Sequence, residues 1–228
     1  MLAQRLGSEP VSIGKYDVAA QDSATTPHFV GHVGLADEQR DDVRWNSEIS
    51  LVHMGPPLMR GPSGIPIHAM GQAGLTASQI RQIGVFVDEH LSEYEAERVR
   101  GPRQYVVHPH VREPDTDVPC RRFSCAGFVI EAYRDADLKL VVTEPSRLPR
   151  VDLETLTNAY SDVAHLLRIP ARRSRFGLQG DGPWPVVLAG YVMNALNRTA
   201  EEIRDGPYTP ASGDEYFPAR RSSSQESE

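Results

Sequence analysis

The stretch from position 123 to position 133 reads Phe123-Ser124-Cys125-Ala126-Gly127-Phe128-Val129-Ile130-Glu131-Ala132-Tyr133 and predicts a turn followed by an amphipathic helix. Apolar or small side chains recur at helical spacing as far as position 136, and the cysteine begins this buried stripe. A thiol at a helix N-terminus lies at the positive end of the helix dipole, which favours the thiolate. The small Ala126 and Gly127 leave room for a substrate carbonyl. We therefore expect Cys125 to be a nucleophile.

A second interpretation of Cys125 is a small core residue, because free cysteines are among the most buried residue types. A nucleophilic cysteine needs a base to take its proton and a polar group to orient that base. The choice between the two interpretations therefore depends on whether the chain supplies a histidine partner.

The composition limits the classes of function. The chain has 228 residues, of which 39% are hydrophobic and 24% charged, as is typical of a soluble globular protein with one sizeable core. Its net charge of −7 argues against a nucleic-acid partner. Cys120 and Cys125 are too few for a disulfide framework, so we expect reduced thiols. No apolar run has the length of a signal peptide or a membrane span, and we expect a cytoplasmic protein.

Two short apolar runs carry histidines. Residues 28–35 predict one strand, with His32 inside it, and residues 49–54 predict another, with His53 near its end. If the two strands are neighbours, both imidazoles lie on one face, and the cysteine helix packed against the sheet completes a Cys125–His32–His53 site. We expect His32 to act as the base and His53 to fix its tautomer by a hydrogen bond.

The sequences His32-Val33-Gly34-Leu35, Leu51-Val52-His53 and Cys125-Ala126-Gly127-Phe128-Val129, followed by Tyr133, resemble the circularly permuted branch of the papain-like NlpC-type hydrolases. That branch includes the lecithin:retinol acyltransferase-like proteins, in which the histidine strand precedes the cysteine helix. The resemblance covers roughly residues 27–142. It implies that His32 is the base, His53 the orienting residue and Cys125 the nucleophile. Ser124 stands where non-permuted relatives usually have an acidic residue.

The rest of the chain is divided by its composition. We expect a lead segment at 1–26, a catalytic core at 27–150, a helical extension at 151–207 and a disordered tail at 208–228. Within these, the pattern predicts an irregular segment at 56–74, a helix from Thr76 to Gly101, and strands at 104–107 and 138–142. Two further helices are expected at 152–168, with Tyr160 on the buried stripe, and from Pro185 to Gly206.

Other polar residues allow competing interpretations. A structural zinc site is one alternative, although its spacing matches no common zinc module; its ligands would be His108, His110, Cys120 and Cys125. His28 and His32 are four residues apart, but in a strand-like run. His68, His90 and His165 are expected to be surface or packing residues. A basic cluster at Arg168, Arg172, Arg173 and Arg175 could bind an anion or, as we prefer, is a solvated helix end. Gly177, Gly180 and Gly182 are expected to form a turn.

The sequence thus predicts an α+β protein of papain-like type, with a small antiparallel sheet packed on the cysteine helix and added C-terminal helices. We expect a thiol hydrolase or acyltransferase that needs no cofactor or metal and forms an acyl-enzyme on Cys125. Its substrate would be a small-molecule, peptide or lipid acyl compound. The alternative is a non-catalytic binding module in which Cys125 is buried and inert.

Overall fold

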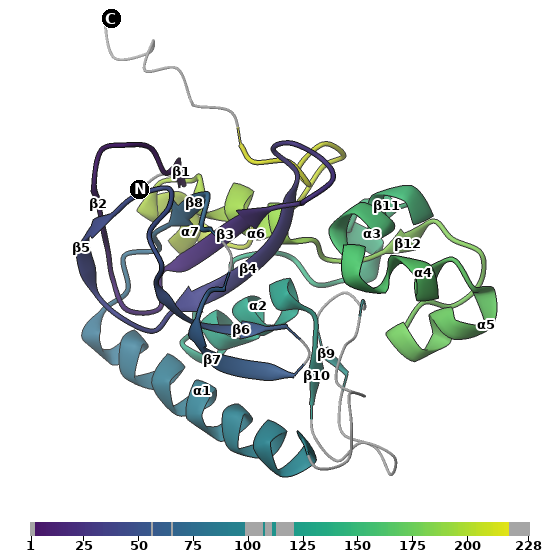
Figure 1. Ribbon diagram of the computed structural model, residues 1–228, viewed down its shortest axis with the longest axis horizontal. Helices are drawn as coiled ribbons and strands as arrows, with labels where there is room; N and C mark the ends of the chain where they lie inside the picture. The colour runs from purple at the N-terminus through teal and green to yellow at the C-terminus, as the bar shows by residue number, and fades with distance from the viewer. Residues whose placement is uncertain are drawn as a thin grey trace, which may run out of the picture.

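A computed structural model gives the fold of residues 3–55, 57–64, 66–98, 107, 111–112 and 121–218 (Figure 1). Its centre is a six-stranded sheet in which every neighbouring pair of strands is antiparallel. In spatial order the strands are β1 (Gln4–Arg5), β8 (Ala69–Gly71), β3 (Val18–Asp22), β4 (Val30–Ala36), β6 (Ser50–Met54) and β7 (Leu58–Pro62). The expected α+β class with an antiparallel sheet is confirmed.

The two faces of this sheet belong to two hydrophobic clusters. Side chains alternate between faces along a strand, and in β4 Val33 and Leu35 join the larger cluster whereas Ala36 joins the smaller one. The smaller cluster also includes residues of β2 (Val11–Ile13) and β5 (Arg40–Val43), which pair with each other. The sheet is therefore covered on both sides by apolar side chains.

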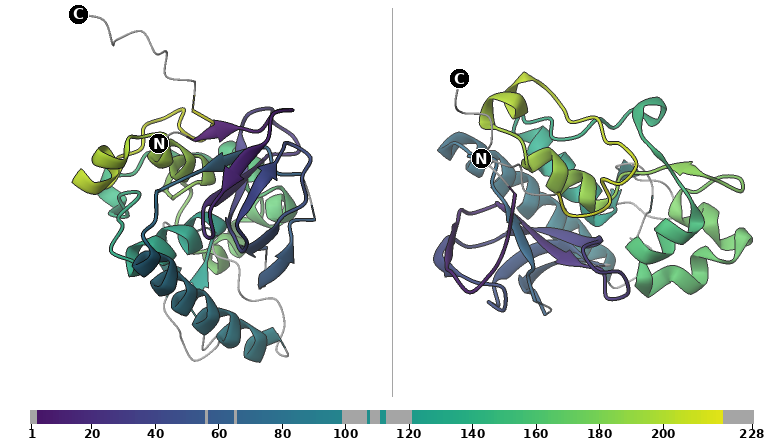
Figure 2. Two further views of the ribbon diagram at one scale, coloured as in Figure 1. Left: turned by 90° about the vertical axis from the view of Figure 1, so that its left-hand side faces the viewer. Right: turned by 90° about the horizontal axis from the view of Figure 1, so that it is seen from above.

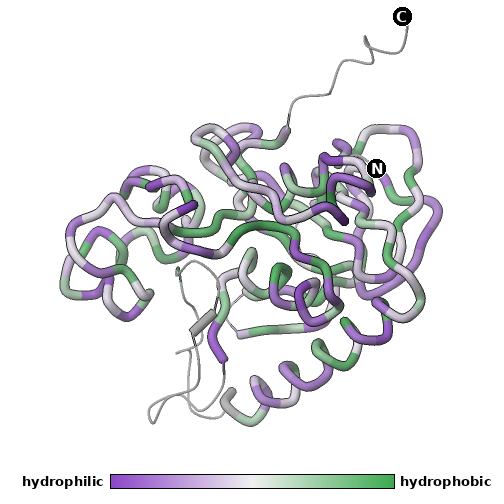
Figure 3. Tube along the Cα trace, turned by 180° about the vertical axis from the view of Figure 1, so that it is seen from behind, coloured by the Kyte–Doolittle hydropathy of each residue, from purple (hydrophilic) through white to green (hydrophobic). Residues whose placement is uncertain are grey.

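The helices that pack with the larger cluster include α1 (Ala77–Arg98), α2 (Cys125–Asp135) and α6 (Ala189–Leu196) (Figure 2). Both predicted helix starts at Thr76 and Cys125 are confirmed. Thr76 and Gln79 exchange hydrogen bonds before α1, and Ser124 caps α2 by accepting the N–H of Gly127 at 3.0 Å. In α2 every residue from Cys125 to Tyr133 is buried, so this helix is central to the core. Figure 3 shows the hydrophobic segments gathered in the middle of the molecule.

A lobe formed by residues 144–186 projects from the side of the molecule (Figure 1). The predicted helix at 152–168 is wrong as one unit, because the backbone of Tyr160 leaves the helical region at φ −127° and ψ 57°. Its buried side chain turns inward at that break. The pieces are η1 (Pro145–Arg147), β11 (Arg150–Val151), α3 (Leu153–Ala159), η2 (Ser161–Val163), α4 (Ala164–Leu167), α5 (Pro170–Arg173), η3 (Ser174–Phe176) and β12 (Trp184–Pro185), with β11 and β12 paired.

Several expected boundaries differ from the structure. β1 and β3, from the expected lead segment at 1–26, belong to the same sheet as β4. The segment 56–74 is not wholly irregular, since it contains β7 and β8. The expected strand at 138–142 is wrong: its apolar residues are buried, but only Val141 forms a bridge, to Tyr208. A further short pair joins β9 (Val111–Arg112) to β10 (Arg122–Phe123). The predicted strand residues 104–106 lie outside the described residues.

The C-terminal part also departs from the prediction. Pro185 lies in β12 and does not start a helix, and the expected single helix is replaced by α6 and α7 (Ala200–Asp205). The chain beyond position 208 does not leave the fold at once. The N–H groups of Val30 and Phe217 donate to the carbonyls of Glu215 and His28 respectively, so this segment runs along the start of β4. Residues 219–228 of the predicted tail lie outside the described residues.

Candidate active site

The two predicted histidines are brought together by neighbouring strands. His32 lies on β4 and His53 on β6, and His32 Nε2 is 2.9 Å from His53 Nδ1. The rings meet edge to face, with centroids 5.0 Å apart at 84°. Gly34 makes this approach possible, because a Cβ at that position would lie 2.8 Å from the Cβ of His53. The expectation that both imidazoles lie on one face is confirmed, and their catalytic roles stay predictions.

The surroundings of both imidazoles favour their neutral form. Burial, together with the neighbouring His53, lowers the pKa of His32 to about 3. Burial also lowers the pKa of His53. Each neutral ring has one N–H group, so in the short contact one ring donates a hydrogen bond and the other accepts it. If Nε2 of His32 donates, its Nδ1 is left with a free lone pair, which is the form that a general base requires.

Cys125 is the first residue of α2 and is 4% exposed. The ladder between β4 and β6 has only the pairs Leu35↔Val52 and Ala36↔Leu51, so Val33 lies beyond its end. The backbone N–H groups of Val33, Ala126 and Cys125 itself lie near the Cys125 sulfur and act to lower the pKa of the thiol. The thiol is thus packed against the residue that directly follows His32.

The charge state of Cys125 differs from the expectation for a helix start. Burial raises the pKa of the thiol, and the three nearby backbone N–H groups oppose this effect without reversing it. The helix dipole favours the thiolate, but the loss of water around a fully buried sulfur is the larger effect. Burial thus favours the neutral thiol at Cys125, whereas the helix start alone led us to expect the thiolate.

Tyr160 is a site residue that the sequence did not reveal. Its hydroxyl makes a hydrogen bond with the Ser124 side chain and is close enough to Cys125 for the thiolate charge to act on it. Burial is the main reason that its pKa is raised. A bond from Ser23 Oγ to the carbonyl of Asn158, at 3.1 Å, fixes α3 against the sheet nearby. Periodicity placed Tyr160 on a buried helical stripe and gave no sign of a contact 35 positions away in the chain.

A cavity of about 380 Å³ lies between β7 and α1. Met59 lines it and is the cross-strand partner of His53. Its lining combines aliphatic and charged side chains, and Arg60 forms a 2.8 Å ion pair with Asp88 across it. The side chains of Cys125, His32 and His53 do not line this cavity.

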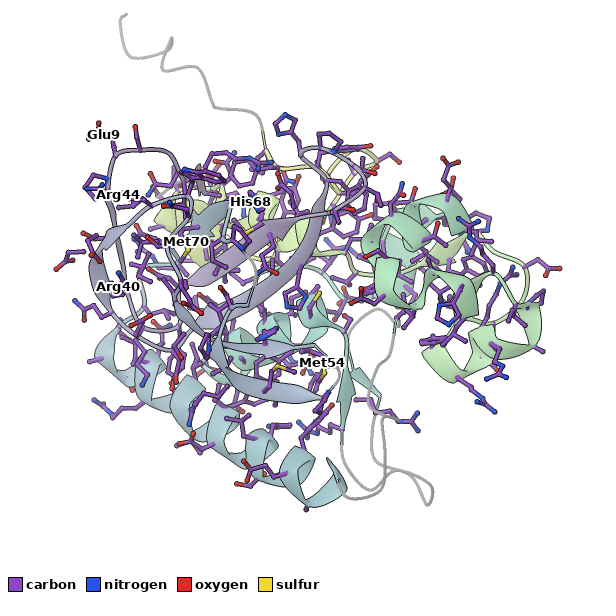
Figure 4. The ribbon with its side chains drawn as sticks, viewed as in Figure 1. Glu9, Arg40, Arg44, Met54, His68 and Met70 are labelled. Carbon is purple, nitrogen blue, oxygen red and sulfur yellow. The ribbon has the colours of Figure 1, made fainter. Side chains whose placement is uncertain are left out.

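The remaining predicted sites do not assemble among the described residues. In that part of the chain no three His, Cys, Asp or Glu residues are placed to hold a metal ion, while His108, His110 and Cys120 of the zinc interpretation lie outside it. His28 and His32 form no ligand pair, because the left-handed backbone of His28 (φ 63°) puts it in a turn. His68 Nδ1 accepts the N–H of Asp22, and Figure 4 shows His68 beside β8.

His90 and His165 behave as expected of packing and surface residues. His90 is buried in α1, with Nδ1 2.8 Å from the carbonyl of Phe86, and His165 is exposed on α4. In the basic cluster only Arg173 is buried; it donates to the carbonyl of Leu167 and stacks over Trp184. Gly177 has the left-handed backbone of a turn, at φ 83°, as predicted.

The chain matches no protein-family model, no curated protein and no solved structure. Across the described residues, no helix is both long and apolar enough to cross a membrane. The assignment of a function therefore rests on the geometry of the thiol and the histidine pair.

Proposed function

We propose that the protein is a thiol hydrolase or acyltransferase that acts on an amide or ester through an acyl-enzyme on Cys125. Two observations carry this proposal: the 2.9 Å contact between His32 and His53, and a thiol at a helix start that lies near the backbone N–H of Val33, the residue after His32. A merely structural cysteine needs neither a pair of neutral imidazoles nor a ring of backbone donors. These are the components that nucleophilic catalysis combines.

In the first step the Cys125 sulfur attacks the substrate carbonyl carbon while the thiol proton moves to Nδ1 of His32. His53 accepts the hydrogen bond from Nε2 of His32 and so keeps Nδ1 free for this proton. The carbonyl oxygen becomes an oxyanion, and the backbone N–H of Cys125 at the helix start donates to it. The product is a tetrahedral intermediate next to a protonated His32.

In the second step the carbon–leaving-group bond breaks and His32 gives its proton to the departing amine or alcohol. A thioester on Cys125 remains. His32 then removes a proton from water or from another acceptor, which attacks the thioester and returns Cys125 to the thiol. The low pKa of His32 favours each return of the proton, because the charged imidazolium is unstable in this buried site.

The order of the parts supports a permuted papain-like arrangement. The histidine strands β4 and β6 precede the cysteine helix α2 in the chain, and α2 packs on β4. We place the protein in the cytoplasm, where its thiol would stay reduced. Peptide, small-molecule and lipid acyl groups all remain possible substrates of this chemistry.

The proposal is tested by trapping the acyl-enzyme. Purified protein is incubated with a set of activated acyl esters and peptide thioesters, and intact-mass spectrometry with peptide mapping locates any adduct. We expect the acyl group on Cys125 in the wild type. Cys125→Ser should form no thioester, and His32→Ala should acylate far more slowly, while His165→Ala should match the wild type. Absence of any adduct on Cys125, in protein shown to be folded by circular dichroism, would contradict the proposal.

A non-catalytic binding module is the second candidate, and one observation favours it. Cys125 is only 4% exposed and burial raises the pKa of its thiol, as for an inert core cysteine. In that case His32 and His53 would form a buried polar contact that specifies the pairing of β4 with β6. A folded protein that is not acylated but binds ligands in the cavity between β7 and α1 would identify this function.

A further inference from the structure

The outer end of the lobe carries a surface that the proposed chemistry does not use. We call it the arginine tip: the exposed residues from Arg168 to Arg172, together with Arg175. It spans the junction of α4 and α5 and the start of η3, at the edge of the molecule farthest from β2 and β5 (Figure 1). Nothing in the thiol mechanism requires this surface.

The arginine tip has an apolar point. Ile169, Pro170 and Ala171 are exposed in succession, and Ile169, at 44%, is among the most exposed large hydrophobic residues described. Pro170 starts α5 and holds this point between the two short helices. Arg168 and Arg172 flank it directly. An apolar point bordered by guanidinium groups on a projecting lobe is better suited to insert into a deformable surface than to fit a preformed pocket of a partner.

The arginines of the tip lack acidic neighbours. Residues 163–180 contain four arginines and no Asp or Glu, so they contribute +4 to a chain of net charge −7 and leave −11 for the rest. Among the described residues no ion pair involves Arg168, Arg172 or Arg175, and the nearby carboxylate of Asp181 lies 3.8 Å from the buried Arg173. By contrast, Arg40 on β5, at the opposite end of the molecule, pairs with Asp42 at 3.0 Å (Figure 4).

We propose that the arginine tip docks the protein on the surface of an anionic lipid bilayer. Three exposed guanidinium groups attract lipid phosphates and carboxylates, and each basic group near such a surface strengthens binding about fivefold. The side chain of Ile169 enters the headgroup region. The strongly acidic remainder of the chain is repelled by the same surface, so only the lobe can approach it. A nucleic acid offers phosphates as well, but it gains nothing from an exposed isoleucine.

Docking at the lobe has a consequence for the candidate active site. The same lobe carries Tyr160, whose hydroxyl bonds to the side chain of Ser124 beside Cys125. A bilayer bound at the arginine tip is therefore connected to the site through one small structural unit, α3 to α5. The docking proposal does not depend on the catalytic one, and either can fail alone.

The test is co-sedimentation of the full chain with vesicles of pure phosphatidylcholine and with vesicles in which about 30% of the lipid is phosphatidylserine. We expect binding to the anionic vesicles only, and a steep loss when salt is raised to about 0.5 M. The triple variant Arg168→Gln/Arg172→Gln/Arg175→Gln should bind on the order of 100-fold more weakly. Ile169→Ser should weaken binding without changing its salt dependence.

The matched control removes three exposed basic residues elsewhere: Arg44→Gln/Arg81→Gln/Lys139→Gln. It changes the net charge equally and should bind as the wild type does. Equal binding of both triple variants, or equal binding to neutral and anionic vesicles, would overturn the proposal. Binding to heparin or a poly-glutamate peptide that depends on the tip, without vesicle binding, would also overturn it and would identify a polyanionic macromolecule as the partner. Circular dichroism of each variant shows that it is folded.

Discussion

The site at β4, β6 and α2 and the lobe at residues 144–186 are built in opposite ways. At the site, polar groups are few: the half-buried His32 and His53 meet at 2.9 Å, and Cys125 is 4% exposed. In the lobe, short helices of four to seven residues carry exposed charges. Buried polar groups change protonation and can transfer protons, whereas exposed charges attract partners. Under our two proposals, the molecule separates chemistry in its sheet from recognition in its lobe.

The strongest test of this division compares a histidine from each region. His32→Ala removes the proposed base, and we expect kcat for acyl transfer to fall about 10³-fold. His165→Ala, on exposed α4, should leave kcat unchanged. Rates are measured with whichever acyl ester labels Cys125. Equal rates in the two variants would remove His32 from the mechanism and with it the contrast between the regions.

The second test concerns a buried carboxyl in the sheet region. Asp17 is 6% exposed, and burial raises its pKa from 3.8 to about 6, although hydrogen bonds from Gly14 and Gln72 favour the charged form. Its folded pKa therefore lies above its unfolded pKa, and the folded state binds the proton first. The free energy of unfolding from this group should rise by about 2 kcal/mol as pH falls from 7 to 4.

The measurement is denaturant unfolding across this pH range for the wild type and for Asp17→Asn. The difference between them isolates Asp17 from the other carboxyls, which titrate in both proteins. Asp181→Asn, in the exposed part of the lobe, is the control and should give curves parallel to those of the wild type. A pH dependence in Asp17→Asn as steep as in the wild type would show that Asp17 is not the responsible group.

The third test concerns the closeness of β4 and β6. Gly34→Ala places a Cβ 2.8 Å from the Cβ of His53 and 3.2 Å from the carbonyl of Val52. Both neighbours belong to a paired strand, so the strands must separate, and we expect a loss of about 2 kcal/mol in unfolding free energy. Gly7→Ala is the control, because its Cβ would meet nothing within 4 Å. Urea unfolding that shows equal stability for the two variants would mean that the sheet relaxes freely at the site.

These tests also separate what the sequence could and could not predict. The helices α1 and α2 and the strands β4 and β6 follow from periodicity, and the pairing of His32 with His53 follows from strand alternation. The run at 138–142 was predicted as a strand because most of its residues are apolar, yet these are buried by packing, and only Val141 forms a bridge, to Tyr208. The charge state of Cys125 depends on how completely the fold excludes water, which no local pattern reports.

The role of Tyr160 also could not be predicted from a local sequence pattern. Tyr160 is the residue through which the lobe contacts the site. Tyr160→Phe removes only the hydroxyl that bonds to Ser124, the residue that caps α2 before Cys125. Without this bond the Ser124 side chain and the helix start are less firmly held, and a misplaced nucleophile reacts more slowly. We expect kcat to fall about tenfold with a small change in KM.

Tyr133→Phe is the matched control, since it removes a buried hydroxyl that donates to the carbonyl of Tyr16 at 2.9 Å, from the distal part of α2. Each variant loses one hydrogen bond and should lose about 1 kcal/mol of stability. If Tyr160 only stabilises the fold, the two variants will have equal stability and equal kcat. If it positions Ser124 and Cys125, only Tyr160→Phe will lose activity. Tyr160 would then be the one residue of the lobe that contributes to the chemistry proposed for the sheet and α2.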